Sequence, residues 1–180
     1  MPGSDDLAVS ILPFGPQDVT DAYVGWLNDP EVMDQTEANT GRHTLASTRD
    51  YIAAANGDPN ARIFRIMAAG EGHVGNIRIS EITRQHQRAD IALIIGRKDL
   101  WGRGIAPQAI ACAVDTGFRE LGLHKLTAGM YHTNTGSIRA FLKAGFREEG
   151  RLPEHYIHNG SYVDRVALGL LRADWERVAD

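Results

Sequence analysis

The sequence predicts an α+β fold, in which hairpin-linked strands are combined with amphipathic helices. Two short turns support this prediction: Gly70-Glu71-Gly72 and Asn159-Gly160 each lie between two strand-like runs, as hairpin turns do. A third observation is the segment 89–121, where a buried strand leads through a glycine-rich turn into a helix. The chain has 180 residues, 43% of them hydrophobic, so we expect one domain over residues 1–180.

The first third of the chain predicts one strand and two helices. Residues 7–14 alternate loosely between apolar and polar side chains, which indicates a strand. Residues 18–28 and 47–56 have apolar residues at helical spacing. Residues 31–42 are polar with little periodicity, and we expect a loop there that could contact a substrate.

The rest of the chain predicts strands and helices separated by glycine, proline and polar turns. We expect strands over residues 62–68, 73–82, 89–95, 125–131, 146–158 and 161–170. We expect helices over residues 107–121, 134–144 and 172–178.

The glycine-rich turn after the expected strand 89–95 has the features of an anion site. Gly102 and Gly104 lack a Cβ, so the backbone around them can bend tightly and let a ligand approach its N–H groups. Pro107 suits the first position of the following helix. Because the first N–H groups of a helix are unpaired and its dipole is positive there, we expect phosphate to bind, with Arg103 as a nearby cation.

Other glycine loops fit this turn less well. The Walker A pattern Gly-x-x-x-x-Gly-Lys-Ser/Thr is absent. A dinucleotide fingerprint needs three glycines after a first strand and an acid about 20 residues later. This turn lies mid-chain, with Pro107 in place of the third glycine and His124 in place of the acid. An ordinary connection before an amphipathic helix remains an alternative from this stretch alone.

Two stretches resemble the CoA-binding motifs of the GCN5-related N-acetyltransferase (GNAT) family. Trp101-x-x-Gly104-x-Ala106 resembles the pyrophosphate loop Gln/Arg-x-x-Gly-x-Gly/Ala, with the Trp that is usual in its RimJ/RimL-like branch. Residues 132–152 resemble the second motif, in which Asn134 precedes a helix that ends in Lys-x-Gly-Phe. The resemblance implies the GNAT fold: a central, mostly antiparallel, twisted sheet that splays at its middle strands, with helices on both faces.

The resemblance also implies acetyl-CoA as acyl donor and assigns residues to it. The backbone N–H groups of residues 103–106 would bind the pyrophosphate, and residues 93–95 would pair with the pantetheine arm. Asn134 would hold that arm through its amide or, equally, cap its helix. The expected cofactor-binding residues are Leu93, Ile94, Ile95, Arg97, Trp101, Gly102, Arg103, Gly104, Ile105, Ala106, Asn134 and Ser137.

Direct acyl transfer needs a base for the amine and a proton for the departing thiolate. Asp90 is the first candidate base, because related enzymes often carry a Glu there; Glu81 is the second, and a water chain is the alternative. Family members often place a Tyr near the sulfur, but here that position is Phe141. Ser137, one turn earlier on the same helix face, could donate to the thiolate or bond locally to the backbone.

Composition argues against several other classes. A net charge of −4 with a pI near 6.0 gives no general attraction to nucleic acid. Residues 1–6 contain no apolar signal region and no 18-residue apolar run occurs, so we expect no membrane partner. A single cysteine, Cys112, excludes disulfides within the chain and fits a cytoplasmic location. His155 and His158 would lie on opposite faces of a strand without further ligands, so we expect no metal.

These observations predict an N-acetyltransferase that moves acetyl from acetyl-CoA to a primary amine. The acceptor is a small molecule, such as an amino sugar, polyamine or amino acid, or the α-amine of a protein. We expect residues 29–42 and 154–162 to line its pocket, where the acids Glu31, Asp34, Glu37 and Glu154 would suit a cation, although exposed acids are usually only solvated. A catalytically inactive CoA-binding regulatory module of the same fold is the alternative. We expect a monomer or a homodimer.

Overall fold

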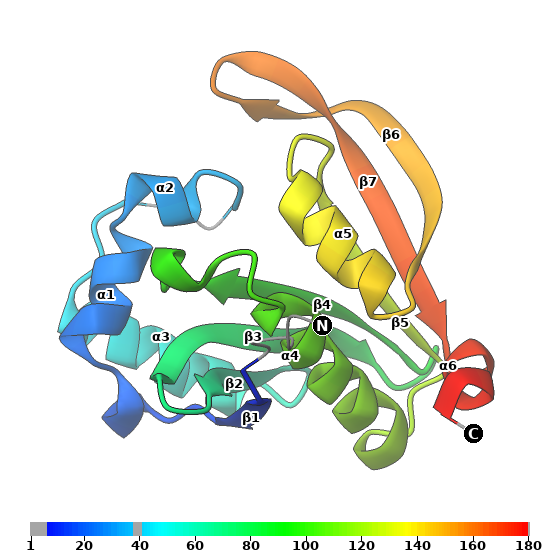
Figure 1. Ribbon diagram of the computed structural model, residues 1–180, viewed down its shortest axis with the longest axis horizontal. Coiled ribbons are helices and arrows are strands. Elements are labelled where there is room, and N and C mark those ends of the chain that lie inside the picture. The colour runs from blue at the N-terminus through cyan, green and yellow to red at the C-terminus, as the bar shows by residue number, and fades with distance from the viewer. Residues whose placement is uncertain (1–6, 38–40, 180) are drawn as a thin grey trace, which may run out of the picture.

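The computed structural model describes residues 7–37 and 41–179, and in it seven strands form one sheet in the order β1-β2-β3-β4-β5-β7-β6 (Figure 1). Neighbouring strands are antiparallel except β4 and β5. The predicted α+β fold with a mostly antiparallel sheet is therefore confirmed. The strands are β1 Val9–Pro13, β2 Arg62–Ala68, β3 Gly72–Thr83, β4 Arg88–Ile95, β5 Lys125–Tyr131, β6 Arg147–His158 and β7 Ser161–Leu171.

Helices cover both faces of this sheet. On one face α4 and α5 pack against a large apolar core that includes Ile66, Ile110, Leu126 and Phe141. On the other face α1 and α3 enclose a smaller cluster with Ile63 of β2. The helices are α1 Asp21–Leu27, α2 Pro30–Met33, α3 Leu45–Gly57, α4 Ile105–Asp115, α5 Thr135–Lys143 and α6 Arg172–Ala179.

The two middle strands separate along most of their length. β4 and β5 are paired only where Arg88–Asp90 meets Lys125–Thr127, and no further register is shared. Beyond Asp90 the strands diverge, as the GNAT resemblance predicted. We call this opening the fork.

Helix α4 starts two residues earlier than predicted. Gly104 adopts a left-handed conformation with φ +74° and is the N-cap, so Ile105 is the first helical residue and Pro107 the third. A proline is tolerated there, because the N–H groups of the first turn have no partner within the helix. At its other end α4 stops at Asp115 and continues as a π-helical turn over Thr116–Glu120.

The segment predicted as the loop 31–42 begins with the short helix α2, which the sequence pattern did not reveal. The side chain of Asp29 accepts a hydrogen bond from the Glu31 N–H, and Pro30 takes the first helical position. Val32 and Met33 are buried, so two apolar residues fix the helix. Residues 38–40 of that segment, and residues 1–6, lie outside the described residues.

Within the ranges that the structure describes, no helix is both long enough and apolar enough to cross a membrane.

Candidate active site

A groove of about 860 Å³ opens at the wide end of the fork, bounded by α2, the end of β4, the start of α4 and the start of α5. Both segments that carry the sequence motifs contribute to its wall. Ten predicted site residues line it: Leu93, Ile94, Ile95, Trp101, Gly102, Gly104, Ile105, Ala106, Asn134 and Ser137. Two parts of the chain about 30 residues apart thus meet in one apolar-walled groove.

The glycine turn has the geometry of an anion cradle. Gly102 and Gly104 have φ values of +77° and +74°, a region that side chains with a Cβ rarely adopt. The N–H groups of Gly104, Ile105 and Ala106 stand at the start of α4, where no intrahelical acceptor exists. The N–H of Arg103 instead donates to the Leu100 carbonyl at 3.3 Å, so it is already engaged.

Trp101 and Arg97 hold this turn in place. The indole Nε1 of Trp101 donates to the Ile95 carbonyl at 2.9 Å, which ties the turn to the end of β4. Arg97 does not line the groove, since its guanidinium bonds the carboxylates of Glu71 at 3.0 Å and Asp99 at 2.6 Å. The structure therefore places Arg97 as a support of the turn.

Asn134 caps α5, because its side-chain oxygen accepts a hydrogen bond from the Ser137 N–H at 3.1 Å. Asn134 therefore acts as the N-cap of α5, and its amide nitrogen donates no hydrogen bond to a described residue. Ser137 lines the groove beside it. Phe141 is fully buried against Phe146, with ring centroids 5.0 Å apart, so it presents no group to the groove.

Asp90 stands where the fork begins to open. Its carboxylate accepts a hydrogen bond from the Thr127 hydroxyl at 2.9 Å, across the last paired position of β4 and β5. Burial raises the pKa of Asp90 to about 6, and the negative charge of Glu81 adds to the rise. Glu81 itself is exposed, in a β-bulge of β3 with φ +53°. Of the two predicted bases, Asp90 has the environment that suits proton transfer near neutral pH.

Asp90 lies on the sheet face opposite α4. Its neighbours Ala89 and Ile91 point into the core under α4, so the alternation of a strand directs Asp90 to the other side. On β5 the residues Thr127, Gly129 and Tyr131 share that side, because Leu126, Ala128 and Met130 lie in the core. We call this surface the fork face.

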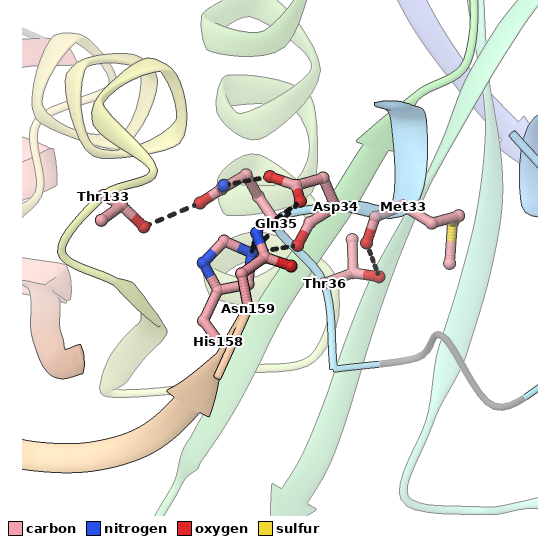
Figure 2. Close-up of polar contacts among 7 residues, drawn as sticks. All are labelled: Met33, Asp34, Gln35, Thr36, Thr133, His158 and Asn159. Atoms are coloured by element: carbon pink, nitrogen blue, oxygen red, sulfur yellow. Dashed lines mark hydrogen bonds and ion pairs between the residues drawn. The ribbon is translucent and has the colours of Figure 1, made fainter. Parts of the chain in front are cut away.

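A polar bridge closes the far end of the fork (Figure 2). His158 donates to the Asp34 carbonyl at 2.9 Å, and the amide of Asn159 donates to the Asp34 carboxylate at 3.2 Å. The Thr133 hydroxyl donates to the Gln35 side-chain oxygen at 3.0 Å. These five residues, the hairpin bridge, join the segment after α2 to the β6–β7 hairpin and to the start of α5.

A comparison with known protein families identifies the family to which this chain belongs. A family model described as an acetyltransferase (GNAT) domain matches residues 9–147. The chain belongs to the GNAT acetyltransferase family. The fork and the glycine turn at α4 are therefore features of a GNAT protein.

Curated relatives of this GNAT chain are named as N-acetyltransferases. It is 28% identical over 160 residues to an uncharacterized N-acetyltransferase p20 of Bacillus licheniformis, which covers 86% of this chain and 88% of the relative. It is 32% identical over 111 residues to spermidine N(1)-acetyltransferase of Escherichia coli strain K12, which covers 62% of this chain and 59% of the relative.

The fold also matches solved structures. A spermidine N-acetyltransferase from Vibrio cholerae, solved with CoA and spermine, superposes with a TM-score of 0.83 at 23% identity, over 93% of this chain and 98% of that chain. This likeness shows the fold. Together with the family match, the relatives identify this GNAT chain as an acetyl-CoA-dependent N-acetyltransferase.

Across residues 7–37 and 41–179, no group of three or more His, Cys, Asp and Glu side chains is placed to hold a metal ion.

Sequence reasoning missed the residues that complete the fork face. Arg165 of β7 and Tyr156 of β6 reach the region of Asp90 and Tyr131 from strands late in the chain. The bonds of the hairpin bridge were also missed, because Asp34 and His158 are separated by 124 residues, although both segments were expected to line the acceptor pocket. No spacing within one segment could indicate either contact.

Proposed function

We propose that this acetyltransferase moves the acetyl group directly from acetyl-CoA to a primary amine, with both substrates bound at once. The observation that carries the proposal is the position of Asp90. The groove with its glycine cradle lies at the α4 and α5 side, whereas Asp90 lies on the fork face. The groove is also lined by Asp34, Gln35 and Thr36, whose segment is bonded to the β6–β7 hairpin, so donor and acceptor would meet between β4 and β5 without a covalent enzyme intermediate.

The groove residues suit the three parts of the donor. The N–H groups of Gly104, Ile105 and Ala106 would bind the pyrophosphate. The backbone of Leu93–Ile95, which β5 does not pair, would bond the amides of the pantetheine arm. The amide nitrogen of Asn134 would hold that arm from the side of α5.

The reaction needs one proton removed and one supplied. Asp90 takes a proton from the acceptor ammonium, directly or through a water, and the neutral amine attacks the thioester carbon. The new C–N bond forms as the C–S bond breaks, and the second proton of the nitrogen passes to the departing CoA thiolate, directly or through water, so the products are the neutral amide and the CoA thiol. Ser137 donates a hydrogen bond to that thiolate, whose thiol has a pKa near 8.5 and needs little acid assistance. Water is the alternative donor.

A turnover assay tests the proposal. The protein is mixed with acetyl-CoA and a panel of primary amines, and release of CoA thiol is followed. Thiol release that depends on an amine supports an enzyme. CoA binding by calorimetry without thiol release for any amine would instead indicate the inactive CoA-binding module. The panel includes spermidine, because relatives carry that substrate in their names.

A further inference from the structure

The guanidinium of Arg165 packs directly against the backbone of Gly129 on the fork face. A β-carbon added to Gly129 would lie only 2.2 Å from its Nη2 and 2.6 Å from its Cζ. Glycine weakens the interior of a strand and commonly marks a site of close approach. We infer that Gly129, in the middle of β5, makes room for the guanidinium of Arg165.

The guanidinium lies between the predicted base and the aromatic end of the fork face. Gly129 is two residues from Thr127, whose hydroxyl bonds Asp90, so the two sites are about 7 Å apart along the strand. Burial raises the pKa of Asp90, and the positive charge of Arg165 counteracts part of that rise, which agrees with their proximity. On its other side Arg165 lies close to the hydroxyl of Tyr156.

This positive charge makes no direct ion pair with a described residue, although Asp90 lies near enough to act on it and Glu37 lies against the same Tyr156 hydroxyl. Among the described residues, no carboxylate lies within 4.0 Å of the Arg165 side chain, although the residue is only partly exposed. Of the acids in the α2 segment, Glu31 bonds Lys98 at 2.7 Å and Asp34 belongs to the hairpin bridge, whereas Glu37 lies against the Tyr156 hydroxyl. A partly buried guanidinium that bonds no carboxylate directly keeps N–H groups available, and a bound carboxylate would pair with them.

We propose that Arg165 binds a carboxylate of the acceptor, so the preferred acceptor is an amine that also carries a carboxylate, such as an amino acid. The inference rests on the proposed function. A planar guanidinium presents paired N–H groups that match a carboxylate. The spacing allows one small molecule to place its amine at Asp90 and its carboxylate at Arg165.

The test uses acceptors that differ only in the carboxylate: lysine, ornithine and tyrosine, their amides, and the corresponding amines without it. We expect wild-type kcat/KM to be at least 10-fold higher for the amino acids. Arg165→Met should remove most of that preference through KM, with CoA affinity unchanged. Arg147→Met, an exposed arginine on β6 at the outer edge of the sheet, is the matched control and should keep the preference.

A second variant separates the role of Arg165 from its effect on folding. Gly129→Ala leaves the charge in place but displaces the guanidinium, so it should reduce the preference in the same direction. Equal rates on amides and amino acids, or a wild-type preference for spermidine, would overturn the inference while the acetyltransferase assignment stands.

The absence of thiol release with every amine would count against the proposed function instead. In that case, binding of lysine to the CoA-bound protein is measured by calorimetry. Equal affinity for wild type and Arg165→Met would then overturn the inference.

Discussion

Asp90 illustrates how a single side chain acquires its chemistry from the place where two strands part. Pairing with Thr127 fixes the carboxylate, and removal from water raises its pKa to about 6. A carboxyl with that pKa is ionised at neutral pH but is still basic enough to accept a proton. This balance suits a general base better than an exposed acid with an ordinary pKa does.

The pH profile tests this role. In wild type, kcat/KM should fall as the pH drops below about 6, because a protonated Asp90 cannot accept the proton from the amine. Asp90→Asn should remove that limb and lower kcat/KM by about 100-fold above pH 6, where the wild-type base is ionised. The matched variant Glu81→Gln, which alters the exposed second candidate, should stay within a few-fold. A low-pH limb that persists in Asp90→Asn would identify a different base.

Ser137 is the second residue whose role can be measured alone. It lines the groove at the first turn of α5, and the neighbouring Phe141 offers no phenol. We expect Ser137→Ala to lower kcat by roughly 10- to 100-fold, with little change in CoA affinity, because its hydroxyl acts only on the developing thiolate. Single-turnover rates with purified variant measure the effect. Wild-type kcat would leave water as the proton donor.

The sequence was informative about residues that belong to local motifs. Gly102, Gly104 and Asn134 each lie within a few residues of the element that they serve, so their spacing revealed them. Arg165 and Asp34 gain their roles from partners on distant strands and turns, and a single sequence carries no signal for those contacts.

At the scale of elements, strand bounds were predicted well where burial is complete. The bounds of β2 and β5 agree with the prediction, because both strands are flanked by polar or glycine-containing turns and face a core. The starts of helices were less accurate. Pro107 suggested a first helical residue, yet the left-handed Gly104 allowed α4 to begin two residues earlier. Helix α2 was missed because four residues are too few to show a period.

The cradle at the start of α4 can be tested as a unit. Gly104→Val adds a side chain where φ is +74°, so it should strain the turn and weaken CoA binding by at least 10-fold. Gly70→Val is the matched control: Gly70 has φ +77° in the β2–β3 turn, and an added Cβ would meet nothing within 4 Å. Both variants should lose similar thermal stability. Calorimetry with CoA should show weaker binding for Gly104→Val than for Gly70→Val. An equal loss of CoA affinity in both variants would contradict the role of the glycine turn in CoA binding.

At the scale of the whole molecule, the fork divides the sheet into two parts that are joined at both ends. At the closed end, β4 and β5 are joined by three residue pairs. At the open end, the hairpin bridge links the segment after α2 to the β6–β7 hairpin (Figure 2). The groove lies between these two connections, so the bridge influences the space that an acceptor enters. The family resemblance predicted the fork, but it contained no information about this closure.

The hairpin bridge should therefore control acceptor binding more than donor binding. Asp34→Ala removes the carboxylate that accepts bonds from Asn159, Gln35 and, at 3.3 Å, His158, while the bond from His158 to the Asp34 backbone carbonyl remains. The tip of the hairpin should therefore become more mobile. We expect a several-fold higher KM for the acceptor, an unchanged CoA affinity and faster hydrogen exchange over residues 154–162. Asp174→Ala is the matched control: it breaks the ion pairs of this α6 residue with Arg147 of β6 and Arg177 of α6, away from the hairpin tip. If both variants change the acceptor KM alike, the closure has no specific role.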